Sequence, residues 1–302
     1  MDFLYLLEKL RIPGLNEFML TVTHLGEETA FLVIALIIFW CVNKYQGYYL
    51  LGVGLMGNLC NQFLKITCRI PRPWVKDPNF TALPSAIPEA SGYSFPSGHS
   101  QTAVGTFGCI AATQKNKIIR AICITFMILV PFSRMYVGVH TPSDVLVGSG
   151  MALVMVFTLK PLLLDKTKNI PIFFAVMTVL SIAYLCYLEL YPFPADIDEE
   201  NYHSAVKNGY TFLGCFTGVL MVYFMDEKLL HFETDAIWWA QVIKAIGGLG
   251  LVLAVKAGMK PVLEAFLPEM PARAVRYCLI VLVAGLVWPM TFKWFAKLGR
   301  KV

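Results

Sequence analysis

The sequence predicts an all-α fold, a polytopic transmembrane helix bundle with about nine spans. Hydrophobic residues make up 57% of the 302-residue chain and charged residues only 15%, whereas a soluble domain carries about 25% charged residues. The apolar residues form long stretches along the whole chain, and about 20 such residues suffice to cross the hydrocarbon layer of a bilayer. The eight cysteines form no Cys-x-x-Cys pair, so we expect neither a disulfide framework nor a zinc site.

The expected spans follow one another along the chain. In order they are roughly 28–42, 48–66, 98–113, 118–133, 144–164, 170–191, 207–225, 236–255 and 273–292. The third is short and rich in small residues, which suits close helix packing in lipid. Before them, residues 1–27 are expected to form an N-terminal interfacial segment, because Leu4, Leu7 and their apolar neighbours recur at helical spacing. We therefore expect this segment, a core over 28–191 and additional transmembrane helices over 192–302.

The loops between the spans predict the orientation. With nine spans, the short turns on the side opposite the N-terminus carry lysines, including Lys44 and Lys115. Because cytoplasmic loops are enriched in lysine and arginine, that side is expected to be cytoplasmic. The long polar connection 67–95 and the acidic connection 192–204 lie on the other side. The net charge of +5 is modest, and we attribute it to cytoplasmic loops rather than to nucleic-acid binding.

Three polar clusters interrupt the apolar pattern. They are KITCRIPRP at 65–73, PSGH at 96–99 and SRMYVGVHTPSD at 133–144. Taken singly, each residue type has an ordinary explanation: a basic residue can snorkel at the interface, a histidine can be structural, and an aspartate can cap a helix. The expected topology, however, brings all three clusters to helix ends at the same membrane face. Polar residues at such depth are costly and usually functional.

The residue types in these clusters fit phosphate chemistry. Two histidines suit a nucleophile and a general acid, because imidazole titrates near neutral pH. We expect His140 to attack phosphorus, His99 to protonate the leaving oxygen, and Asp144 to orient the His140 ring. The expected phosphate-binding groups are Lys65, Arg72, Arg134 and the backbone N–H groups of Ser97 and Gly98. This chemistry requires no metal and no cofactor.

The three clusters resemble the signature of the type 2 phosphatidic acid phosphatase superfamily. Its blocks Lys-x6-Arg-Pro, Pro-Ser-Gly-His and Ser-Arg-x5-His-x3-Asp occur complete and in order within residues 48–164. The resemblance implies metal-independent dephosphorylation of lipid phosphates or diphosphates, and inhibition by vanadate, because vanadium haloperoxidases belong to the superfamily. It also implies a six-helix phosphatase core, to which this chain adds about three C-terminal spans. The roles that it implies for the residues named above agree with the chemical reasoning.

These observations leave alternatives for the substrate and for the function. We expect an integral-membrane phosphatase in the plasma membrane, with its active site on the extracytoplasmic side and with undecaprenyl diphosphate or a phosphatidate-like lipid as substrate. A water-soluble ester such as a sugar phosphate is an alternative, because glucose-6-phosphatase, a superfamily relative, also has nine spans. A transporter or binding protein without hydrolysis is another, although the complete set of His99, His140 and Asp144 argues against it.

A few polar residues outside the three clusters remain. His24, Glu27 and Glu28, near the first span, either line an entrance or simply lie at the interface, and we expect the interfacial placement. Lys244 lies mid-way along the eighth span. It marks a second polar cavity or, more simply, snorkels or pairs with a neighbour.

Overall fold

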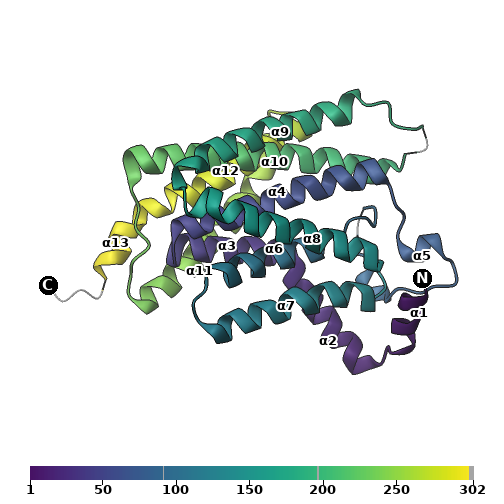
Figure 1. The fold of residues 1–302 in the computed structure, drawn as a ribbon. Coiled ribbons are helices and arrows are strands. Elements are labelled where there is room, and N and C mark those ends of the chain that lie inside the picture. Colours follow the sequence, from purple (N-terminus) through teal and green to yellow (C-terminus); the bar gives the residue numbers. More distant parts are fainter. Residues whose placement is uncertain (91, 196, 299–302) are drawn as a thin grey trace. The chain divides into compact units, whose positions relative to one another are not determined.

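The computed structural model describes residues 1–90, 92–195 and 197–298 (Figure 1). Within these ranges the protein consists of helices joined by loops and contains no strand, which confirms the all-α prediction. Residue 196 of the acidic connection and residues 299–302 of the expected C-terminal segment lie outside the described residues.

The helices are labelled as in Figure 1. The α-helices are α1 (Asp2–Lys9), α2 (Pro13–Thr23), α3 (Glu28–Cys41), α4 (Lys44–Cys68), α5 (Pro73–Lys76), α6 (Gly98–Thr113), α7 (Lys117–Tyr136), α8 (Pro142–Leu159), α9 (Ile170–Leu190), α10 (Glu199–Met225), α11 (Trp238–Glu264), α12 (Glu269–Leu282) and α13 (Phe292–Lys297). Shorter helical turns are η1 (His24–Gly26), η2 (Pro84–Ala86), η3 (Lys160–Leu164), η4 (Thr167–Asn169), η5 (Asp226–Leu230), η6 (Val283–Val287) and η7 (Pro289–Thr291).

The chain folds into two compact units. Unit 1 comprises Met1–Leu32, Val53–Lys160 and Ala195–Ala205; unit 2 comprises Val33–Gly52, Pro161–Pro194 and the chain from Val206 onward. This division differs from the three consecutive segments expected from the sequence, because α3, α4 and α10 each contribute residues to both units. All three polar clusters belong to unit 1.

Helix α6 forms the centre of unit 1. It packs against both α7 and α8, and every residue from Ser100 to Cys109 is buried. Small residues allow this close packing: a Cβ on Gly105 would lie 3.3 Å from Val53, and a Cβ on Gly108 would lie 3.1 Å from Val156. Small residues are typical of helix contacts in lipid because they let backbones approach closely. The start of α6, which carries the PSGH cluster, is thereby held in the interior of the unit.

Side-chain caps determine where the helices of unit 1 begin. Ser97 caps α6, and Asn116 caps α7. Thr141 and Asp144 form a reciprocal capping box at α8, with Pro142 at its first position. These caps accept hydrogen bonds from the first N–H groups of each helix, which have no helical acceptor. Two of the three caps belong to the polar clusters, so the same residues fix the backbone and build the site.

The N-terminal segment supports the loops of unit 1. Arg11, between α1 and α2, donates Nε to the carbonyl of Tyr136 at 3.1 Å and Nη1 to the carbonyl of Thr81 at 2.6 Å. Leu4 and Leu7 of α1 are buried, whereas other apolar side chains of the same helix are exposed. This amphipathic pattern fits the interfacial helix expected from the sequence.

In unit 2, helices α10 and α12 approach closely at two glycines. A Cβ on Gly214 would lie 2.2 Å from the carbonyl oxygen of Ala274, and a Cβ on Gly218 would lie 2.8 Å from Val281. Glycines four residues apart on one helix face are typical of tightly packed membrane helices. The packing of this helix pair therefore depends on both glycines.

Lys244 of α11 is fully buried in unit 2. Its Nζ donates to the carbonyl of Thr234 at 2.8 Å and lies 4.4 Å from the ring centre of Phe292. A carbonyl and an aromatic face together satisfy an ammonium group. The contacts thus favour the simpler of the two sequence interpretations, a lysine paired within the fold.

Six helical segments among the described residues are long and apolar enough to cross a membrane. They are Lys117–Tyr136, Pro142–Leu164, Thr167–Leu190, Glu199–Leu230, Trp238–Glu264 and Glu269–Lys297, and a seventh span results if Pro13–Gly26 and Glu28–Cys41, bent by 53°, are counted as one. The expected count of nine is not confirmed. Helices α3 and α6 have only 14 and 16 residues, fewer than the about 20 that cross a bilayer core, and α4 carries polar residues such as Asn58 and Asn61.

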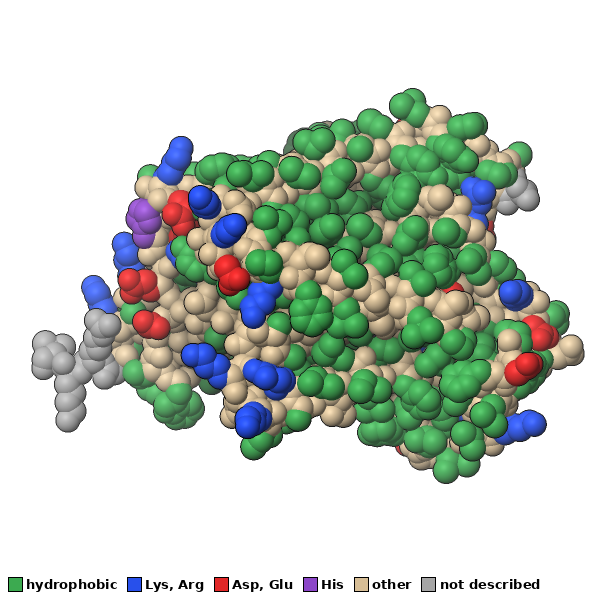
Figure 2. Space-filling model, viewed as in Figure 1, with side chains coloured by type: hydrophobic (Ala, Val, Ile, Leu, Met, Phe, Trp, Pro, Cys, Tyr) green, Lys and Arg blue, Asp and Glu red, His purple; other side chains and the backbone are tan. Residues whose placement is uncertain are grey.

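Exposed apolar side chains cover the outer surfaces of the long helices. Figure 2 shows hydrophobic side chains along α7 and α8, where Ile118, Ile128, Leu146 and Phe157 are among the exposed residues. A soluble protein rarely exposes so much contiguous apolar surface. The helices of unit 1 therefore have the surface of a protein embedded in lipid, and the protein is a multi-pass membrane protein.

Candidate active site

The first cluster places two buried basic side chains at the loop before α6. Lys65, in the last turn of α4, donates Nζ to the carbonyl of Tyr93. Arg72 donates Nε to the carbonyl of Gly92 at 3.0 Å and Nη1 to the carbonyl of Val139 at 3.0 Å. Both basic side chains are buried. Arg72 therefore connects the loop before α6 with the loop before α8.

Both ring nitrogens of His140 have close polar neighbours. Nη1 of Arg72 lies 2.9 Å from Nε2 and 3.5 Å from Nδ1. Nδ1 also lies 3.5 Å from Oδ2 of Asp144 and 3.5 Å from Oγ of Ser94. Oδ2 of Asp144 accepts hydrogen bonds from Oγ of Ser94 at 2.6 Å and from the backbone N–H of Thr141 at 2.7 Å. Asp144 and Ser94 therefore lie near Nδ1, and Nε2 is the ring nitrogen closer to the Arg72 cation.

Ser97 joins the start of α6 to the start of α8. Its backbone N–H donates to the carbonyl of Asp144 at 2.9 Å, and a Cβ on Gly148 would lie only 2.5 Å from its carbonyl oxygen. The Ser97 amide is thus engaged within the protein, contrary to the expectation that it points to a phosphate. The N–H groups of Gly98 and His99, in the first turn of α6, have no acceptor within the helix, so they are the amides that this helix start offers to an anion.

His99 and Arg134 each bury a nitrogen that has no hydrogen-bond partner among the described residues. These atoms are Nε2 of His99 and Nε of Arg134. Arg134 is 1% exposed, and its Nη1 donates to the hydroxyl of Thr23 at 2.6 Å. Because buried polar atoms are nearly always paired in folded proteins, the two nitrogens indicate where the acceptor atoms of a ligand belong.

The cations of the site change the titration of the loop residues. The pKa of His140 is lowered well below its ordinary 6.5, mainly because burial disfavours the charged ring and further because Arg72, Arg134, Lys65 and His99 repel a positive charge. Burial lowers the pKa of Arg72 to about 10, against a smaller opposing effect of Asp144. At neutral pH the histidine is therefore neutral while Arg72 is charged.

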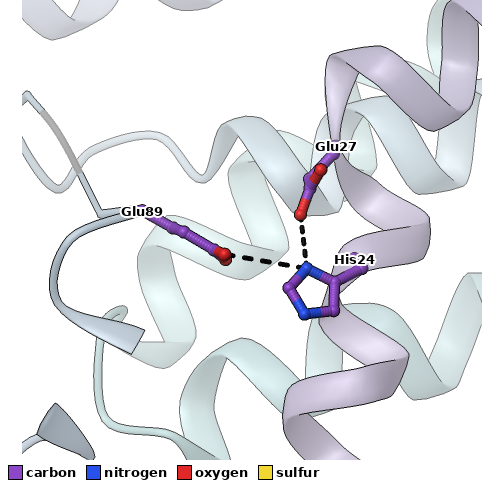
Figure 3. Close-up of side chains that lie close together, drawn as sticks. All are labelled: His24, Glu27 and Glu89. Atoms are coloured by element: carbon purple, nitrogen blue, oxygen red, sulfur yellow. Dashed lines mark hydrogen bonds and ion pairs between the residues drawn. The ribbon is translucent and has the colours of Figure 1, made fainter. Parts of the chain in front are cut away.

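Three further side chains lie beside this site (Figure 3). Nδ1 of His24 is 2.5 Å from Oε1 of Glu27 and 3.7 Å from Oε1 of Glu89. The turn η1, which carries His24, packs directly on His99, since a Cβ on Gly26 would lie 2.8 Å from the His99 carbonyl oxygen. We call His24, Glu27 and Glu89 the rim cluster. Its position favours the entrance interpretation of His24 and Glu27 over the interfacial placement expected from the sequence.

The structure gathers the residues expected from the sequence into one region of unit 1. Direct contacts join Arg72, His140, Asp144 and Ser97, and electrostatic interactions join His140 to Lys65, His99 and Arg134. The interpretation of the sequence missed Ser94, Thr23 and Glu89. Ser94 stands within the stretch that contains the PSGH cluster, but nothing in its residue type distinguishes it from other loop serines.

The chain matches two family models. "PAP2 superfamily" matches residues 46–168, and "PAP2 superfamily phosphatase, transmembrane extension" matches residues 210–301. The first segment contains all three polar clusters, and the second contains most of α10 and the helices that follow it.

Two relatives come from Bacillus subtilis (strain 168). The chain is 32% identical to phosphatidylglycerophosphatase B over 166 residues, which cover 50% of this chain and 76% of that protein. It is 30% identical to undecaprenyl-diphosphatase BcrC over 129 residues, which cover 42% of this chain and 64% of that protein. No solved structure matches the chain.

These matches agree with the geometry of the site. The matched segment 46–168 holds every side chain of the histidine, carboxylate and cation constellation, and the similarity to phosphatidylglycerophosphatase B extends over most of that relative. The chain therefore belongs to the PAP2 superfamily of phosphatases and is a hydrolase of phosphoric esters.

Proposed function

We propose that this protein is an integral-membrane, metal-independent phosphatase that hydrolyses a lipid phosphate or diphosphate through a phosphohistidine intermediate. The proposed substrates are undecaprenyl diphosphate or a phosphatidate-like lipid. Both relatives are named as lipid phosphatases, and the exposed apolar surface of α7 and α8 supports a substrate that lies in the membrane.

The orientation of His140 is the observation that carries the proposal. Asp144 and Ser94 lie near its Nδ1, while Nη1 of Arg72 is closer to Nε2, at 2.9 Å, than to Nδ1, at 3.5 Å. A phosphate bound by Arg72 would therefore lie next to Nε2. The carboxylate on the opposite side favours the tautomer with a proton on Nδ1 and a lone pair on Nε2, which is the role of the third group in a catalytic triad.

In the first step, Nε2 of His140 forms a bond to phosphorus as the bond from phosphorus to the leaving oxygen breaks. His99, whose Nε2 has no partner among the described residues, donates a proton to that oxygen. Lys65, Arg72, Arg134 and the N–H groups at the start of α6 bind the other phosphate oxygens. Such preorganised donors stabilise the charge of the transition state.

In the second step, water attacks the phosphohistidine. The new bond from oxygen to phosphorus forms as the bond from Nε2 to phosphorus breaks, and His99 accepts the proton that the water loses. Inorganic phosphate leaves, and both histidines return to their starting states. Asp144 stabilises the positive ring of His140 while phosphate is attached.

We further propose that the protein spans the plasma membrane nine times, with the site on the extracytoplasmic side. Seven candidate spans are obtained when the bent α2–α3 pair is counted as one span. Helices α4 and α6 are the other two of the proposed nine. The buried surface of α6 explains why its sequence need not be as apolar as that of a helix that faces lipid. The lysines of the turns opposite the site support the orientation.

A substrate panel with purified protein tests the proposal. Release of phosphate is measured from phosphatidylglycerophosphate, undecaprenyl diphosphate and glucose 6-phosphate, for the wild type and for His140→Ala. We expect the wild type to hydrolyse a lipid substrate, and we expect chelator to leave hydrolysis of the lipid monophosphate undiminished. In His140→Ala the rate of phosphate release should fall by about 10⁴-fold or more. His203→Ala, at an exposed histidine of α10, is the matched control and should retain activity.

Three results would contradict parts of this proposal. Activity confined to glucose 6-phosphate would exclude a lipid substrate. Unchanged phosphate release by His140→Ala would exclude the phosphohistidine. Loss of monophosphate hydrolysis on chelation, restored by added metal, would exclude metal independence.

A further inference from the structure

The rim cluster takes no part in the reaction described above, yet its three side chains converge. His24 begins the turn η1, Glu27 follows that turn, and Glu89 comes from the loop before α6 (Figure 3). One ligand atom from each residue lies within 4.8 Å of the other two. The side chains are 53%, 34% and 40% exposed, so an ion in solution can reach them.

In the part of the chain that the structure describes, His24 is the only basic partner that forms an ion pair with the carboxylates of the rim cluster. Two carboxylates face one imidazole nitrogen, which carries at most one proton. Among the described residues, neither Glu27 nor Glu89 forms an ion pair with lysine or arginine. A divalent cation between the carboxylates would remove their repulsion. One imidazole nitrogen and two carboxylate oxygens form a donor set that Zn²⁺ and Mn²⁺ accept.

A second observation, at Arg134, points to an anion beside the cluster. Arg134 is buried and its Nε has no partner among the described residues, while its Nη1 is held by Thr23, the residue before His24. Both Glu27 and Glu89 interact electrostatically with Arg134. The rim cluster therefore lies close to Arg134, one of the proposed phosphate-binding side chains.

We propose that His24, Glu27 and Glu89 hold a divalent cation, Zn²⁺ or Mn²⁺, that binds the second phosphate of a diphosphate ester while the first phosphate reacts at His140. Without the ion, the two carboxylates repel that second phosphate. With the ion, the carboxylates are neutralised, and open coordination positions accept phosphate oxygens. The ion binds substrate and takes no part in bond making. The role toward a diphosphate depends on the proposed function, whereas ion binding does not.

Ion binding is tested with the full-length protein in detergent. The protein is stripped with chelator, titrated with Zn²⁺ and with Mn²⁺ by calorimetry, and analysed for bound metal after gel filtration. We expect a saturable site in the wild type, and an affinity at least about tenfold lower in His24→Ala and in Glu89→Gln. Glu17→Gln, at an exposed glutamate of α2, is the matched control and should bind like the wild type.

The binding data can also overturn the proposal. No saturable binding in the wild type, or equal binding by the wild type and both rim variants, would show that the cluster holds no ion. The three side chains would then form only the contacts that join His24 to the two carboxylates.

The role toward substrate is tested by comparing a prenyl diphosphate with a lipid monophosphate. We expect the ion to raise kcat/KM for the diphosphate by about tenfold, equivalent to ~1.4 kcal/mol, and to leave the monophosphate unaffected. Glu89→Gln should remove this difference. An equal effect of the ion on both substrates would overturn recognition of the second phosphate. Hydrolysis of neither lipid, with or without the ion, would instead overturn the proposed function and leave the binding result intact.

Discussion

At the scale of single residues, Ser94 is the least conspicuous member of the site and contacts two of its central groups. It is fully buried, donates its hydroxyl to Asp144 at 2.6 Å and lies 3.5 Å from Nδ1 of His140. Asp144 itself is 3.5 Å from that nitrogen, beyond ordinary hydrogen-bond length. Ser94 therefore helps to position the carboxylate near Nδ1, while the Arg72 guanidinium lies closer to Nε2.

Replacement of Ser94 tests this positioning role. Ser94→Ala should lower kcat by about tenfold with little change in KM, because a group that acts on His140 orientation affects the reaction more than the binding of phosphate. The measurement is steady-state phosphate release. Ser85→Ala, at an exposed serine of η2, should be unaffected; equal effects of the two substitutions would contradict the role of Ser94.

The low pKa of His140 predicts a particular pH dependence. Burial, and then the repulsion from Arg72 and the other cations, lower the pKa of His140 well below its ordinary value of 6.5. The rise of kcat/KM with pH that reports His140 in the free enzyme should therefore lie well below pH 6.5. Removing a repelling charge raises the pKa of the histidine, so Arg72→Gln should move this rise to higher pH.

Arg72→Lys provides the control because it keeps the positive charge. The pH profile of Arg72→Lys should stay close to that of the wild type, although both variants lose activity through weaker phosphate binding. The variants are compared by the pH at which kcat/KM rises, not by the size of kcat/KM. Coinciding limbs in Arg72→Gln and the wild type would show that the arginine does not control the titration.

At the scale of elements, the site depends on the close approach of α6 and α8. Gly148 of α8 lies against the carbonyl of Ser97, and the Ser97 amide donates to the carbonyl of Asp144. A hydrogen bond thus joins the start of α6, which carries His99, to the start of α8, which carries Asp144. Gly148 sets the distance between the two helix starts, because any side chain at that position would overlap the Ser97 carbonyl.

A pair of glycine substitutions in α8 tests this contact. Gly148→Ala should lower both thermal stability, by roughly 1–3 kcal/mol, and activity, because the added Cβ must displace the start of α6. Gly150→Ala is the matched control: a Cβ there would meet nothing within 4 Å, and the better helix propensity of alanine stabilises by up to about 1 kcal/mol. Similar behaviour of the two variants in thermal unfolding and phosphate release would rule out a special contact at Gly148.

At the scale of the whole molecule, the orientation in the membrane follows from α7. This helix is a candidate span, with Lys115 just before its start and Arg134 in its last turn. The site and the turn that contains Lys115 therefore lie at opposite membrane faces if α7 crosses the bilayer. The expected orientation assigns the lysine turn to the cytoplasm.

Cysteine labelling tests the orientation. Lys76 and Lys115 are both exposed lysines in loops or short turns of unit 1, so each is replaced by cysteine in a background that lacks the exposed Cys68 and Cys186. A membrane-impermeant thiol reagent should label Lys76→Cys in intact cells and Lys115→Cys only after permeabilisation. The reverse pattern would place the active site in the cytoplasm.

The sequence by itself determined the helical class, the membrane environment, the chemistry and the superfamily. These depend on local patterns: apolar stretches reveal helices in lipid, and the clusters at 65–73, 96–99 and 133–144 reveal phosphate chemistry by residue type and spacing. Such local patterns can be recognised without knowing which helices pack together.

Only the tertiary structure decided which atoms meet. It showed that Ser94 donates a hydrogen bond to Asp144, that the Ser97 amide is engaged within the protein, that Arg72 lies closer to Nε2 than to Nδ1 of His140, and that Glu89 lies beside His24. It also left the nine-span count unconfirmed. The physical reason is that these contacts depend on how closely helices approach, which is set by glycines and buried small residues in α6 and α8 rather than by the patterns that define each helix.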